Sequence, residues 1–258
     1  MSTEPPAPPA ARRRGVYLLP NLFTTGGLFA GFYAIVAGIN GRFDDAAIAV
    51  FVAGLLDGID GRVARLTNTQ TDFGMQYDSL ADLVSFGLAP ALVMYTWALS
   101  GLASFGPVWA KVGWSAAFLY AACAALRLAR FNTMVGTTDK RYFIGLASPA
   151  AAGLMMSFVW AAIEAGVQPY DAMYLALGIT VVAGLLMVSR VRYWSFKAAP
   201  VSERVPFLWV PVLVVIFVLL AIDTPRVLFG IAVIYVLSGP ILLLAARGRT
   251  PRPPAIAE

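Results

Sequence analysis

Long apolar runs, separated by short polar connections, recur from about residue 21 to residue 246 of this 258-residue chain. A run of roughly 20 apolar residues is long enough to cross the hydrocarbon core of a bilayer. Hydrophobic residues make up 59% of the chain and charged residues only 13%, whereas soluble domains are about 25% charged. The sequence therefore predicts an all-α fold, in the form of a polytopic helical membrane protein.

The apolar runs predict about eight transmembrane helices. We expect them near residues 21–40, 44–67, 75–100, 108–132, 145–166, 170–189, 206–222 and 226–246. Residues 1–15 are rich in Pro and Ala and end in basic residues, which is typical of a disordered cytoplasmic tail. Residues 247–258 form a second basic, Pro-rich tail.

The basic residues predict the orientation of these helices. With the N-terminus inside and eight alternating spans, 16 of the 19 Lys and Arg residues lie at the inner side. Only Arg42, Lys111 and Arg226 lie at the outer side. The positive-inside rule therefore predicts that both termini are cytoplasmic. The same distribution accounts for the net charge of +5 without a nucleic-acid partner.

The chain has no histidine and a single cysteine, Cys123, within an apolar run. These facts exclude histidine-ligated zinc, Ser-His-Asp triads, histidine bases and an intrachain disulfide. Any acid–base chemistry must depend mainly on carboxylates, lysine or tyrosine.

Four aspartates stand out against the apolar background. Asp57 and Asp60 are spaced i, i+3 at the inner end of the second predicted helix, and Asp78 and Asp82 are spaced i, i+4 at the start of the third. Each pair therefore lies on one helix face. A connection of about ten residues allows the two helices to run antiparallel. We expect the four carboxylates to converge at one depth, just below the cytoplasmic surface.

Such a cluster requires neutralisation, because one Asp or Arg at the centre of a membrane helix costs about 2.5–3.5 kcal/mol. Arg62 and Arg65 could pair with two of the aspartates. A divalent metal site would neutralise the rest, and carboxylate ligands favour Mg²⁺ or Mn²⁺, with Ca²⁺ as a further option. Four carboxylates suit two metal ions acting on a phosphoryl group. Interhelical salt bridges and an ion path are the alternatives.

The pattern Asp57-x2-Asp60-Gly61-x2-Ala64-Arg65-x8-Gly74-x3-Asp78-x3-Asp82 resembles the signature of the CDP-alcohol phosphatidyltransferases, position for position. The resemblance implies that the four aspartates hold two divalent ions, which bind the pyrophosphate of a CDP-linked lipid. It also implies that Asp82, the last of the set, is the general base that takes the proton from the acceptor alcohol. In this family the signature straddles two membrane helices, as it does in the predicted layout.

The resemblance extends to the residues around the CDP-lipid. Those implied to contact it are Asn21 and Thr24, from an element similar to PN-x-x-T, and Gly61, Ala64, Arg65, Thr71 and Gly74. Gly61 and Ala64 would let the nucleotide approach the helix backbone, and Arg65 could offer a bidentate fork to a phosphate. Asn21 also suits a helix N-cap, which is an equal alternative.

Three further stretches, QYDSLADLVSFGLAPALV, ALRLARFNT and YFIGLASPAAAG, are similar to the phosphatidylserine synthase branch of the family. That branch commonly has LPxPAAA in the third stretch, where this chain has Ala147 in place of the first Pro. The implied reaction transfers the phosphatidyl group from CDP-diacylglycerol to L-serine, giving phosphatidylserine and CMP. Arg127 or Arg130 could hold the serine carboxylate and Asn132 a polar group, although positive-inside placement explains both arginines equally well.

A sibling enzyme using glycerol 3-phosphate or another alcohol is the first alternative. An ion-coupled transporter is a remote one, because no inverted repeat or pair of broken helices is evident. The resemblance further implies a six-helix core over 16–190, an added two-helix extension over 191–246 and a homodimer. We expect an integral protein of a bacterial inner membrane, with its active site facing the cytoplasm. Gly27 and Gly31 form a small-xxx-small pair, for which packing within the bundle is favoured over a dimer seam.

Overall fold

The structure is a computed structural model, and it describes residues 18–67, 71–133, 142–194 and 209–247. The predicted disordered tail over 1–15 and nearly all of the tail over 247–258 lie outside these residues. The elements in chain order are α1 (Leu18–Ile39), α2 (Phe43–Leu66), α3 (Asp72–Asp82), η1 (Leu83–Leu88), α4 (Ala89–Trp97), η2 (Leu99–Phe105), α5 (Pro107–Thr133), β1 (Tyr142–Ile144), α6 (Ser148–Glu164), α7 (Pro169–Val188), β2 (Arg192–Trp194), α8 (Trp209–Ile222) and α9 (Thr224–Arg247).

Every predicted helix is present, with both ends within three residues of the predicted bounds. The third predicted helix corresponds to α3, η1 and α4 taken together. Five stretches in the described part of the chain are long and apolar enough to cross a membrane, and these are Pro20–Ile39, Asp72–Trp97, Pro107–Thr133, Pro169–Val188 and Thr224–Leu243. The helical fold is therefore confirmed, and these stretches fit an integral membrane protein. The count of eight spans and their orientation stay predictions.

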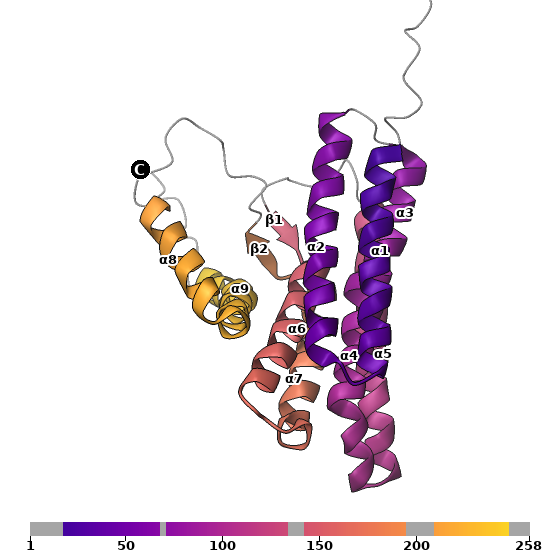
Figure 1. Cartoon of the computed structure of the whole chain (residues 1–258), viewed down its shortest axis with the longest axis vertical. Helices are drawn as coiled ribbons and strands as arrows, with labels where there is room; N and C mark the ends of the chain where they lie inside the picture. Colours follow the sequence, from indigo (N-terminus) through magenta and orange to yellow (C-terminus); the bar gives the residue numbers. More distant parts are fainter. Residues whose placement is uncertain (1–17, 68–70, 134–141, 195–208, 248–258) are drawn as a thin grey trace, which may run out of the picture.

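Helices α1 to α5 form an elongated bundle, and α8 and α9 lie to one side of it (Figure 1). The N-terminal end of α1, the C-terminal end of α2 and the N-terminal end of α3 meet at one end of this bundle, at the top of Figure 1. The core between α1 and α2 is built from buried alanines, including Ala34, Ala37, Ala46 and Ala53. Small side chains allow the two helix backbones to approach closely.

Gly27 and Gly31 are used for packing inside the bundle, as the favoured interpretation predicted. A Cβ atom added at Gly31 would lie 2.7 Å from the Cα atom of Ser85, which is closer than real Cβ contacts. The Ser85 hydroxyl donates a hydrogen bond of 3.0 Å to the backbone oxygen of Gly27. Helix α1 therefore rests directly on η1.

The segment η1 is a π-helix that begins immediately after Asp82. π-helical turns inside longer helices are rare and frequently occur at functional sites. The buried Tyr120 hydroxyl of α5 donates a hydrogen bond of 3.0 Å to the Phe86 carbonyl within this turn. The sequence predicted one regular helix here, so the π-turn is a feature that the apolar pattern missed.

A short antiparallel ribbon pairs β1 with β2, with Phe143 opposite Tyr193. The fully buried Tyr193 donates a hydrogen bond of 3.2 Å from its hydroxyl to the Val236 carbonyl of α9. The all-α prediction did not include these strands, because three residues are too few to show an alternating pattern. Through Tyr193 the ribbon contacts the C-terminal helix α9.

Candidate active site

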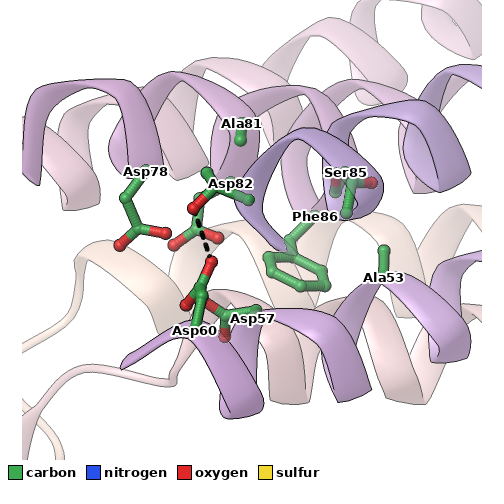
Figure 2. A pocket seen from close by; sticks show the side chains of 10 residues that line it. Ala53, Asp57, Asp60, Asp78, Ala81, Asp82, Ser85 and Phe86 are labelled. Atoms are coloured by element: carbon green, nitrogen blue, oxygen red, sulfur yellow. Dashed lines mark hydrogen bonds between the residues drawn. The ribbon is translucent and has the colours of Figure 1, made fainter. Parts of the chain in front are cut away.

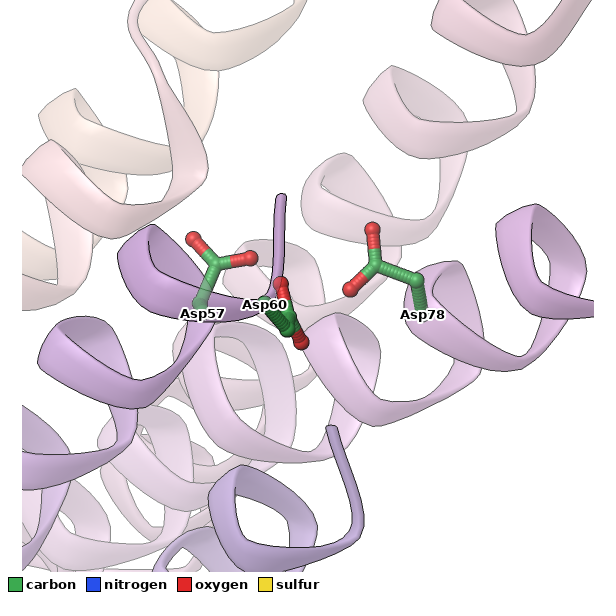
Figure 3. A group of neighbouring side chains, drawn as sticks. All are labelled: Asp57, Asp60 and Asp78. Atoms are coloured by element: carbon green, nitrogen blue, oxygen red, sulfur yellow. The ribbon is translucent and has the colours of Figure 1, made fainter. Parts of the chain in front are cut away.

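Carboxylates from two helices meet in one pocket at the end of the bundle. Asp57 and Asp60 of α2 and Asp78 of α3 each offer an oxygen, and these three oxygens lie within 4.8 Å of one another (Figure 3). Asp82, at the end of α3, lines the same pocket from the side of Asp78 (Figure 2). The structure therefore brings together the four aspartates that the sequence predicted would converge.

The helix spacing explains this convergence. Asp57 and Asp60 are almost one turn apart on α2, and Asp78 and Asp82 are one turn apart on α3, so each pair projects from one face. The rest of the pocket is lined by the small residues Gly27, Ala53 and Ala81 together with Thr24, Ser85 and Phe86.

The Thr24 hydroxyl lies within this acidic pocket. It donates a hydrogen bond of 2.7 Å to Oδ2 of Asp60 and also lies 3.1 Å from the Pro20 carbonyl oxygen. Thr24 is 6% exposed and Asp60 is 5% exposed. A buried carboxylate requires hydrogen-bond donors, and Thr24 supplies one from a different helix.

Thr71, Gly74 and Asn21 lie beside one another where the start of α3 meets α1. Thr71 is the N-cap of α3, because its side-chain oxygen accepts a hydrogen bond of 3.0 Å from the Gly74 backbone N–H. A Cβ atom added at Gly74 would lie 3.5 Å from Oδ1 of Asn21. Helix α1 begins at Leu18, so Asn21 lies inside the helix and the N-cap interpretation of Asn21 is wrong.

Gly61, Ala64 and Arg65 occupy the last two turns of α2. Gly61 is exposed, and a Cβ atom added there would have no atom within 4 Å. The exposed Arg65 side chain donates a hydrogen bond of 2.8 Å from Nε to the Gly61 carbonyl of its own helix. This end of α2 therefore presents an open surface at Gly61 with an exposed cation, Arg65, on the same helix.

Arg127 and Arg130 of α5 have different surroundings. Arg127 interacts electrostatically with Asp82 and donates a hydrogen bond of 3.0 Å from Nη1 to the fully buried Ser148 hydroxyl. Arg130 donates from Nη2 to the Ile144 carbonyl at 2.8 Å and from Nη1 to the Val188 carbonyl at 3.3 Å. Arg127 therefore lies next to the acidic pocket, whereas Arg130 ties α5 to the ribbon and to the end of α7.

Asn132 lies two residues beyond Arg130 on α5 and donates a hydrogen bond of 3.0 Å from Nδ2 to the Ser79 hydroxyl. Ser79 directly follows Asp78, so this contact joins α5 to the helix that carries two of the aspartates. Ser148, the partner of Arg127, was not singled out by sequence reasoning. Its signal was its place in the stretch YFIGLASPAAAG, which carried the resemblance to one branch of the family.

The donor set of the pocket fits a hard divalent cation. The three clustered ligand atoms are all carboxylate oxygens, and Mg²⁺, Mn²⁺ and Ca²⁺ prefer oxygen ligands. Three negative charges held this close together also favour a bound cation, which would offset their mutual repulsion. The residues present therefore fit a metal site, although the geometry does not distinguish Mg²⁺ from Mn²⁺.

A bundle of apolar helices with a carboxylate cluster at one end fits the class of integral membrane proteins with a cluster that could hold a cation. Comparison with known proteins narrows this class. The model of the CDP-alcohol phosphatidyltransferase family matches residues 17–186, and the chain belongs to that family.

Several relatives carry the name CDP-diacylglycerol–serine O-phosphatidyltransferase. A protein of that name from Helicobacter pylori (strain J99) is 37% identical over 220 residues, which cover 85% of this chain and 90% of the relative. One from Bacillus subtilis (strain 168) is 32% identical over 181 residues, covering 69% of this chain and 91% of the relative. One from Mycobacterium bovis is 40% identical over 154 residues, covering 57% of this chain and 51% of the relative.

Proposed function

We propose that this protein transfers the phosphatidyl group of CDP-diacylglycerol to the hydroxyl of L-serine, giving phosphatidylserine and CMP. The observation that carries this proposal is the similarity over 85% of the chain to a relative named for that reaction. The site supports it, because Arg127 interacts electrostatically with Asp82, the carboxylate that we assign as the base. The alternative of a sibling enzyme for glycerol 3-phosphate has no comparable support among these relatives.

In the proposed reaction, Asp82 accepts the proton of the serine hydroxyl. The serine oxygen attacks the lipid-side phosphorus and forms a new P–O bond. The bond from that phosphorus to the oxygen bridging it to CMP breaks, and CMP leaves with the bond's electron pair. Asp82 then releases its proton to solvent, which returns the carboxylate to its starting state. Asp82 lines the pocket at the start of the π-turn, so its carboxylate is held at the junction of two helix geometries.

Asp57, Asp60, Asp78 and Asp82 would hold two Mg²⁺ or Mn²⁺ ions, and these would neutralise the pyrophosphate and the charge that develops on the leaving CMP. The chain itself supplies the carboxylates from two helices and the hydrogen bond that fixes Asp60. Asn21, Thr71 and Gly74 lie close together between α1 and the start of α3, and we assign them to the nucleotide. The open end of α2 offers Gly61, Ala64 and Arg65 to the phosphates.

Arg127 is the stronger candidate for the serine carboxylate. Arg127 interacts electrostatically with Asp82, the proposed base. Serine carries its carboxylate and its hydroxyl on neighbouring carbons, so this pairing of a cation with a base suits serine. In the described part of the chain, Nε of Arg127 is buried and has no hydrogen-bond partner. Nη1 is fixed by Ser148, so the guanidinium is oriented before the acceptor binds. Arg130 already donates to two carbonyls, which favours a structural role for it.

We also propose that the active site faces the cytoplasm of a bacterial inner membrane. The basic residues support this orientation. An exposed aromatic cluster of Phe105, Trp109, Tyr170 and Tyr174 supports a second interface at the outer ends of α5 and α7, since aromatic side chains are enriched at membrane–water boundaries. The division into a core over 16–190 and an extension over 191–246, and the homodimer, remain proposals that rest on the family resemblance.

The test is CMP release by the purified protein with CDP-diacylglycerol and Mn²⁺ or Mg²⁺. L-Serine, glycerol 3-phosphate, an inositol phosphate and no acceptor are compared in parallel. Release that requires both serine and metal supports the proposal. Release with glycerol 3-phosphate alone retains the chemistry but refutes serine as the acceptor. Absence of release with every acceptor, in protein shown to be folded, refutes the enzymatic proposal and favours transport.

A further inference from the structure

The first half of α1 forms hydrogen bonds with α2 and α3, which carry the aspartates, and with η1, which follows Asp82. Thr24 donates to Asp60 of α2, and the Thr25 hydroxyl lies 2.9 Å from the Tyr77 hydroxyl of α3. The Gly27 carbonyl accepts from Ser85 of η1 at 3.0 Å. These three contacts fall within four consecutive residues of α1. This segment therefore touches both sides of the acidic pocket.

Of these contacts, only that of Thr24 reaches an aspartate directly. A threonine hydroxyl has a single proton, and here it has two neighbouring acceptors, the Asp60 carboxylate at 2.7 Å and the Pro20 carbonyl at 3.1 Å. The shorter distance and the charge of the carboxylate favour Asp60, because hydrogen bonds to ionised acceptors are shorter and stronger than neutral ones. The proton of the buried Thr24 hydroxyl is therefore donated to Asp60, within the carboxylate cluster.

We propose that Thr24 is a positioning residue, which holds one oxygen of Asp60 and leaves the other for a divalent cation. The proposal rests on the proposed function, since the cation is the one assigned to the carboxylate cluster. Outer hydrogen-bond partners of metal ligands fix the orientation of the ligand, and their loss typically weakens metal binding 10–100-fold. The family resemblance instead implied that Thr24 contacts the CDP-lipid.

The positioning role and the nucleotide-contact role of Thr24 predict different metal affinities when no nucleotide is present. A positioning residue affects the cation even when no nucleotide is present, whereas a nucleotide contact affects only the affinity for the CDP-lipid. Thr24→Val removes the hydroxyl and keeps the β-branched shape, and Thr24→Ser keeps the hydroxyl. Thr180→Val is a matched control, because Thr180 is fully buried and its hydroxyl bonds to the Ala176 carbonyl of its own helix.

Each full-length, detergent-solubilised variant is titrated with Mn²⁺ in the absence of nucleotide. Electron paramagnetic resonance measures the concentration of free Mn²⁺ at each step. The Mn²⁺ concentration for half-maximal CMP release and the KM for CDP-diacylglycerol are measured alongside. We expect Thr24→Val to weaken Mn²⁺ binding about tenfold, Thr24→Ser to stay within about twofold of wild type, and Thr180→Val to leave binding unchanged.

Unchanged Mn²⁺ affinity in folded Thr24→Val would overturn the positioning role, and a rise confined to the KM for CDP-diacylglycerol would return Thr24 to the nucleotide site. Equal weakening in Thr24→Val and Thr24→Ser would also overturn it, because the hydroxyl would then not be the cause. If Thr24→Val does not fold, Thr24→Ser and Thr24→Ala are compared by the same titration. Wild-type protein that binds no Mn²⁺ refutes the metal assignment itself, and the positioning role with it.

Discussion

Replacing Gly31 with alanine tests how closely α1 must approach the catalytic elements. The added Cβ atom would lie 2.7 Å from Cα and 2.9 Å from Cβ of Ser85. The nearest neighbours therefore include a backbone atom, which cannot rotate away as the end of a long side chain can. We expect α1 and η1 to separate, and the hydrogen bond from Ser85 to the Gly27 carbonyl to weaken.

The size of the effect follows from three contributions. Forcing one extra carbon into a packed contact costs about 1–3 kcal/mol. Loss of one hydrogen bond costs about 0.5–1.5 kcal/mol more. Alanine recovers about 1 kcal/mol, because glycine is the poorer helix former. The free energy of unfolding should therefore fall by about 2 kcal/mol, which for a chain of this size lowers the midpoint of thermal unfolding by roughly 4–8 °C.

The assay is thermal unfolding of purified protein in one detergent at one heating rate, followed by circular dichroism and by loss of CMP release. Gly178→Ala is the control, since Gly178 is exposed on α7 and an added Cβ atom meets nothing within 4 Å. The control should keep or slightly raise the midpoint. Equal midpoints for Gly31→Ala and wild type would refute the reasoning, because they would show that α1 and η1 are not in close contact.

Three further substitutions and removal of the metal test the site. Asp82→Asn should reduce CMP release at least about 10³-fold while CDP-diacylglycerol still binds in equilibrium dialysis, because the amide keeps the shape but cannot accept the proton; a modest loss would exclude Asp82 as the base. Arg127→Lys should raise the KM for serine about tenfold with little change for CDP-diacylglycerol, since lysine lacks the bidentate fork. Arg130→Met should lower the thermal midpoint by several degrees and leave the ratio of the two KM values unchanged, because its bonds are to backbone carbonyls. Chelation with EDTA should stop CMP release, and Mn²⁺ or Mg²⁺ should restore it; activity that survives full chelation would refute the metal assignment.

The helices and the carboxylate cluster could be predicted because each depends on local spacing. Apolar runs bounded by Gly, Pro and charged residues set the helix ends to within three residues. The i, i+3 and i, i+4 spacings place Asp57 with Asp60 and Asp78 with Asp82 irrespective of the rest of the chain. The short connection between α2 and α3 then brings the two pairs to the same end of the bundle.

The features that were missed depend on tertiary contacts. The π-turn after Asp82 follows a run of ordinary helix formers, and its Phe86 carbonyl is satisfied by Tyr120, which is 34 residues away. The different surroundings of Arg127 and Arg130 could not be predicted either, since the positive-inside rule places both at the same end of α5. The two arginines differ in their tertiary partners: Ser148 lies beside Arg127, and the ribbon and the end of α7 lie beside Arg130.

The eight signature residues between Asp57 and Asp82 identify the carboxylates, but they do not determine how far apart the two pairs are held. That distance depends on α1, which contacts α2 through Thr24 and η1 through Gly27 and Gly31. Bound cations would require the four carboxylates to converge despite their repulsion, so the protein must hold them together before a cation arrives. A helix that lies outside the signature and bonds to both sides of the pocket provides this restraint. Substitutions in α1 should therefore alter metal affinity even where they touch neither the nucleotide nor the acceptor.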